Sequence, residues 1–141
     1  MMNLEDPLKA ELEFSADIVV VAIGENVPDP ATEEARTRFA AAFARFLTVL
    51  QRQGHPAIFV RSSFWPHAVK DDIMRQASAG AGAMFVDISA LGREESHAAR
   101  SERRIGHAGV AGHPGDKGMR AIAGAIYTAV RARSAVAAPG R

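Results

Sequence analysis

The chain contains no cysteine, which excludes disulfides, thiolate metal sites and a cysteine nucleophile. It also lacks an excess of charge of one sign: the net charge is +1, and the basic residues are not concentrated as binding to a nucleic-acid backbone requires. Nucleic acid is therefore not an expected partner. No apolar run has the length of a transmembrane helix or of a signal peptide, so we expect no membrane partner and a cytoplasmic location.

What is present is the composition of an ordinary globular domain, with 48% hydrophobic and 23% charged residues in a chain of 141. Three short apolar runs, rich in Val, Ile and Phe, lie at residues 18–23, 57–60 and 83–88. Continuous apolar strands are typical of parallel sheets, whose strands are buried on both faces. Helical patterns alternate with these runs, so the sequence predicts an α/β fold. We expect three layers around a flavodoxin-like parallel sheet, incomplete because only three strands are recognisable.

The helical patterns place three helices between and after these strands. The first spans about residues 30–53, with Asp29 as its N-cap. The second spans about residues 66–78, and the last begins near Asp116. Residues 92–112, rich in Arg, Glu, His, Ala and Gly, fit none of these elements. A segment of this length is either a solvated or partly helical surface excursion or the rim of an active site, and both interpretations stay open.

Two stretches lie where open α/β sheets bind ligands, beyond the carboxyl ends of the strands. The first strand runs into Gly24, Glu25 and Asn26 ("VVVAIGEN"), and His113 with a following proline opens the last helix ("GHPGDKGMRAIAGAI"). With "AMFVDISAL" between them, these stretches resemble the SGNH/GDSL-type hydrolase family over about residues 16–132. The resemblance implies a serine hydrolase acting on a small-molecule acyl or acetyl ester. Asn26 and the Gly24 region would stabilise the oxyanion, and His113 would be the general base.

The chain departs from the family at two points. The Gly-Asp-Ser nucleophile block and the second, glycine block are absent, and the residues before Ile18 are too few to hold them. The aspartate that the family places three residues before the histidine is Val110 here, and a neutral side chain cannot orient the imidazole. The resemblance therefore covers the family's C-terminal portion. We expect one domain over residues 1–133, truncated on its N-terminal side, and a flexible tail at residues 134–141.

Other residues are candidates for the missing roles. Ser62 and Ser63 follow the second predicted strand, where a serine within reach of His113 would satisfy the geometry of an activated nucleophile. Their alternative interpretation, as turn residues, is the one we favour. Glu25 is a candidate carboxylate, and Trp65 is either a packing anchor or an apolar pocket wall. The five histidines lack the spacing of a known metal motif, so we expect no metal and no cofactor.

Two functions stay open from the sequence. The first is an ester hydrolase whose serine comes from outside this chain or from an atypical position. The second is a catalytically inactive relative that binds a ligand or a partner through the same cleft, and the loss of both the serine block and the carboxylate favours it. A nucleotide-binding α/β module has little support, because Gly24 stands alone rather than in a glycine-rich phosphate loop.

The absent serine strand would lie beside the first predicted strand in the family's sheet. Without it, residues 18–23 form an edge that carries no charge or proline to discourage pairing with another chain. We therefore expect a homodimer, or pairing with a separate segment, through this strand. A milder alternative is a short helix from residues 7–14 that folds over the edge.

Overall fold

The computed structural model describes residues 9–52 and 54–137. Its regular elements alternate between helix and strand up to the last strand, and short helical turns then lead to a long final helix. In chain order they are α1 (Lys9–Glu13), β1 (Ile18–Val21), α2 (Glu33–Gln51), β2 (Ala57–Arg61), α3 (Ala68–Gly80), β3 (Met84–Val86), the 3₁₀ turns η1 (Leu91–Arg93), η2 (Glu95–His97) and η3 (Ala99–Ser101), α4 (Ala108–Ala111) and α5 (Asp116–Ala137).

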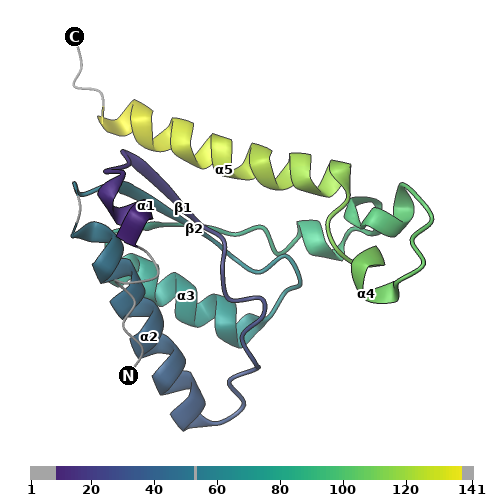
Figure 1. Ribbon diagram of the computed structural model, residues 1–141, viewed down its shortest axis with the longest axis horizontal. Coiled ribbons are helices and arrows are strands. Elements are labelled where there is room, and N and C mark those ends of the chain that lie inside the picture. Colours follow the sequence, from purple (N-terminus) through teal and green to yellow (C-terminus); the bar gives the residue numbers. More distant parts are fainter. Residues whose placement is uncertain (1–8, 53, 138–141) are drawn as a thin grey trace.

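The three strands form one parallel sheet in the order β1-β2-β3. Helices α2 and α3 pack together on one face, and α5 runs along the other (Figure 1). The predicted α/β architecture with a parallel sheet is therefore confirmed, and the sheet is small and open. No helix in the described part of the chain is both long and apolar enough to cross a membrane.

The core lies on both faces of β2, the central strand. Ile58 and Val60 join the cluster under α2 and α3, while Phe59, between them, joins the cluster under α5. This alternation follows from the strand's two-residue period, and all three side chains are almost fully buried. Leu47 of α2 and Met74 of α3 complete the first cluster, so the connecting helices are fixed to the sheet by apolar packing.

Two helix starts differ from the sequence-based expectation. The N-cap of α2 is Thr32 rather than Asp29, because the Thr32 hydroxyl accepts a hydrogen bond of 3.2 Å from the N–H of Ala35. Asp29 instead contacts the start of α3. That helix begins two residues later than expected, at Ala68, with His67 as its N-cap.

The two ends of the described chain also differ in part from expectation. Helix α5 continues to Ala137, so residues 134–137 of the predicted tail are helical, and residues 138–141 lie outside the described part. The short helix that was the alternative for residues 7–14 forms as α1, and residues 7 and 8 of that range lie outside the described part. It leaves Ile18 and Val20 of β1 exposed.

Candidate functional site

The candidate site lies where the carboxyl ends of the strands meet the segment of residues 91–112. Three loops leave the sheet at this end, at residues 22–32, 62–67 and 87–90. The 3₁₀ turns and α4 project beyond the sheet at the point where α5 begins (Figure 1). Residues 92–112, expected as either an excursion or a site rim, are partly helical, and their last residues contact the β2 loop.

The loop after β1 turns at Gly24, whose φ of +106° lies in the region that favours glycine. The N–H of Val27 closes the turn on the Gly24 carbonyl at 3.2 Å. This turn directs Glu25 inward to the loop after β2 and leaves Asn26 exposed. The residue that the resemblance makes the oxyanion donor is therefore open to solvent, and its neighbour provides the contact to the rest of the site.

Glu25 holds the β2 loop through its carboxylate. Arg61 donates to Oε1 at 3.0 Å and to Oε2 at 3.3 Å, and the backbone N–H of Phe64 donates to Oε1 at 2.6 Å. Burial raises the pKa of Glu25, but the hydrogen bonds from Arg61 and Phe64 and the charges of Arg61 and His113 outweigh it, so the pKa lies below its ordinary value.

Among the described residues, neither candidate serine forms a hydrogen bond with the His113 ring. The Ser62 hydroxyl donates to Asp87 Oδ1 at 3.3 Å and accepts from the N–H of Ile88 at 2.8 Å, so it ties β2 to the end of β3. Ser63 is buried, and its Oγ has no hydrogen-bond partner among the described residues. Ser62 therefore links two strands, whereas the hydroxyl of Ser63 has no such role.

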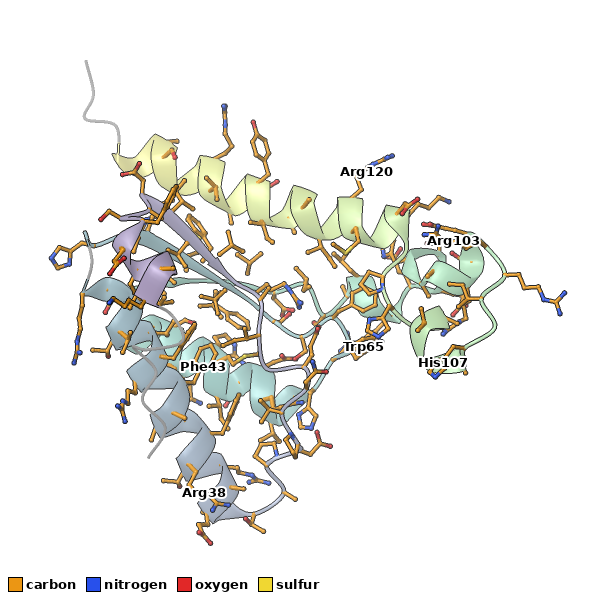
Figure 2. The ribbon with its side chains drawn as sticks, viewed as in Figure 1. Arg38, Phe43, Trp65, Arg103, His107 and Arg120 are labelled. Carbon is orange, nitrogen blue, oxygen red and sulfur yellow. The ribbon has the colours of Figure 1, made fainter. Side chains whose placement is uncertain are left out.

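His113 rests on Trp65. The two rings meet edge to face, with centroids 4.7 Å apart and planes at 84°, and Trp65 Nε1 donates to the carbonyl of Gly112 at 3.2 Å. Figure 2 shows Trp65 at the end of the sheet that faces α4. Trp65 also contacts Phe64 edge to face. Glu25, Phe64, Trp65 and His113 therefore form a continuous series of contacts from β1 to the start of α5.

The carboxylates near His113 do not orient its ring. Val110 is 51% exposed on α4, and the His113 ring accepts or donates no hydrogen bond among the described residues. Asp116 is the first residue of α5, and the carboxylate of Glu102 caps this helix. It accepts from the N–H groups of Asp116 and Lys117 at 2.8 and 2.7 Å, a stable arrangement because an anion at a helix N-terminus meets unpaired donors.

The sequence analysis missed a second polar cluster, where Asp29 meets the start of α3. His67 Nε2 lies 2.7 Å from Asp29 Oδ1, and His67 Nδ1 accepts from the N–H of Lys70. The Lys70 ammonium is almost fully buried and donates to the carbonyls of Val27 and Gly24 at 3.1 and 3.4 Å. The sequence carried one signal, a histidine just before the second helix followed three residues later by a lysine.

Arg61, the partner of Glu25, was also missed. A charged residue at the last position of a buried strand is the signal that would have found it, because such a charge needs a partner. No group of three or more His, Asp or Glu side chains suited to a metal ion occurs among the described residues. Comparisons with protein-family models, with curated proteins and with solved structures found no match to this chain.

Proposed function

We propose that the carboxyl end of this sheet is the oxyanion and general-base side of an ester-hydrolase site that has no serine nucleophile of its own. The observation that carries the proposal is the convergence of the Gly24–Asn26 turn and His113, linked through Glu25 and the Phe64–Trp65 pair. These residues come from loops after two different strands and from the start of α5, which is where α/β sheets bind ligands.

The proposed chemistry assigns one role to each residue. An attacking hydroxyl loses its proton to the His113 imidazole as its oxygen bonds to the ester carbonyl carbon. The carbonyl oxygen gains negative charge, and the exposed Asn26 amide donates to it. Collapse of the tetrahedral species expels the alcohol, which takes the proton from His113. Ser62 and Ser63 are engaged or buried, so the attacking hydroxyl belongs to water, to an added alcohol or to another polypeptide segment.

A second candidate function is supported by Val110. Because no carboxylate orients His113, the same surface suits a catalytically inactive relative that binds a carboxylate- or ester-bearing ligand beside Trp65. In that case His113 and Asn26 would bind the ligand without catalysing its hydrolysis. The two functions differ in whether replacing His113 abolishes turnover or only binding.

The first experiment is intact-mass analysis after incubation with a fluorophosphonate probe, which reacts with activated serines. We expect no stoichiometric adduct. An adduct on Ser62 or Ser63 that disappears in His113→Ala would overturn the claim that this chain has no nucleophile.

The second experiment measures acyl transfer from p-nitrophenyl acetate to water and to added methanol. We expect His113→Ala to lower the rate by at least about tenfold, because general-base catalysis contributes roughly 10²- to 10⁴-fold at a well-formed site. The control is His107→Ala, which removes an exposed histidine at the start of α4 (Figure 2). Equal losses in both variants would mean nonspecific imidazole reactivity. If His113→Ala leaves the rate unchanged but abolishes a ligand-induced change in Trp65 fluorescence, the binding function is correct instead.

A further inference from the structure

The free edge of β1 is an unusual surface for a single folded chain. In the described residues β1 pairs with β2 alone. Val19 and Val21 pack into the core, whereas the alternate side chains of Ile18 and Val20 are 47% and 45% exposed on the other face. Helix α5 packs over β2 and β3 and leaves these two side chains uncovered.

Among the residues that the structure describes, no partner pairs with the backbone of the same two residues either. The N–H of Ala57 donates to the carbonyl of Asp17. This hydrogen bond sets the phase of the pairing, that is, which residues of β1 direct their backbone groups toward β2. In this phase Val19 and Val21 direct their N–H and C=O groups to β2, so those of Ile18 and Val20 point away from the sheet. A row of unpaired donors and acceptors with apolar side chains is a template for another strand.

We propose that this edge pairs with the β1 edge of a second copy of the chain, antiparallel, about a two-fold axis at Val19. In this register Ile18 lies opposite Val20 of the partner subunit, and each such pair exchanges two backbone hydrogen bonds because all the groups involved point outward. The exposed side chains of Ile18 and Val20 then cover one another on a common face. The edge is thus self-complementary, as an interface with two-fold symmetry requires.

An apolar groove enlarges this surface beyond the strand. It has a volume of about 430 Å³ and is lined by Leu12, Phe14, Ile18 and Val20 among others. The groove offers places for apolar side chains of the second copy beside the paired strands.

The charge of the chain favours this occupant. A net charge of +1 sets little repulsion between two copies. The inference does not depend on the proposed hydrolase activity, because β1 pairing involves no residue of that site.

The first test is the mass in solution, measured by light scattering and sedimentation from low to high micromolar concentration. We expect a dimer, and we expect the double variant Ile18→Lys/Val20→Lys to be monomeric with an unchanged far-ultraviolet circular dichroism spectrum. Val110→Lys is the matched control, because it places a lysine at an equally exposed apolar position on α4, and it should stay dimeric. A wild-type monomer at every concentration, or a dimer that tolerates both lysines, would overturn the proposal.

The second test determines the register in which the two strands pair. Because the chain has no native cysteine, an introduced cysteine can form a disulfide only with the same residue of another copy. At the proposed axis the two Val19 Cα atoms lie about 4.5 Å apart, within the range of about 4.4 to 6.8 Å that a disulfide spans. Val19→Cys should therefore form a disulfide-linked dimer on mild oxidation. Val21→Cys, whose two copies would lie about 14 Å apart, should not. Cross-linking of Val21→Cys alone, or of neither variant in a dimeric sample, would show that this pairing is wrong.

Discussion

The segments that follow the two outer strands, β1 and β3, contact the loop after β2 in different ways. On the β1 side, the Glu25 carboxylate accepts hydrogen bonds from Arg61 and from the N–H of Phe64. On the β3 side, Gly92 lies against the carbonyl of Phe64, where an added Cβ would lie 1.6 Å from the oxygen. A hydrogen bond to a carboxylate therefore fixes the N–H of Phe64, whereas close packing against Gly92 fixes its C=O. Only the first of these contacts responds to pH.

The largest expected effect comes from the contact that depends on shape. Gly92→Ala forces a methyl group into the Phe64 carbonyl, so either η1 or the β2 loop must move. Overpacking against backbone rather than a flexible side chain should lower the free energy of unfolding by about 3 kcal/mol, the upper end of the usual range. Urea denaturation followed by circular dichroism measures this change.

Gly124→Ala is the control for this prediction. Gly124 lies within α5, and a Cβ there would meet no atom within 4 Å. Alanine is a better helix former than glycine by about 1 kcal/mol, so this variant should be as stable as the wild type or more so. Similar midpoints for Gly92→Ala and the wild type would mean that the β3 side is not tightly packed.

The next effect compares the two outer strands directly through the same substitution. Val86 of β3 is 8% exposed, and Val20 of β1 is 45% exposed. Val86→Ala should cost about 1–3 kcal/mol in a dilute sample, and Val20→Ala less than about 1 kcal/mol, because only the first removes buried methyl groups. If β1 pairs with a second copy, the cost of Val20→Ala will rise with protein concentration while that of Val86→Ala will not. Equal costs in dilute solution would contradict the difference between the two edges.

The sequence predicted the strands well because their apolar runs are local signals. The run at residues 18–23 ends two residues beyond β1, since Ile23 continues the apolar pattern after the chain has turned away from β2 toward Gly24. The start of α2 was misplaced because residues 29–33 contain two capping signals, and the choice between them depends on a contact between Asp29 and α3. Such a contact between distant segments has no local trace in the sequence.

The candidate site was predictable only in part, for the same reason. Glu25, Trp65 and His113 each follow a predicted strand, and this was enough to predict that they lie at one end of the sheet. The structure places them there. Their position after the strands was not enough to predict that Glu25 would pair with Arg61, a residue 36 positions away. The roles of Asn26 and His113 in catalysis stay predictions, since they depend on a ligand rather than on the fold.

A smaller loss than that of Val86→Ala, and one that depends on pH, is expected from Glu25→Gln. Removing the carboxylate leaves Arg61, whose side chain is 13% exposed, without its anion. We expect a loss of about 1–2 kcal/mol at pH 7, a value reduced because Glu25 is partly open to solvent. Glu95→Gln is the control, because it breaks an exposed carboxylate–arginine pair with Arg100 and should leave stability close to the wild-type value.

The pH dependence of this loss follows from the lowered pKa of Glu25. A carboxylate whose pKa is lower in the folded state stabilises the fold fully above its ordinary value of 4.5 and loses that contribution as the pH falls through the folded-state pKa. The stability difference between the wild type and Glu25→Gln should therefore be constant from pH 7 to about pH 5 and shrink at lower pH. Urea titrations across this range measure it. A difference that stays constant down to pH 3 would mean that the ionised carboxylate does not hold the β2 loop, and that both sides of Phe64 are fixed by shape alone.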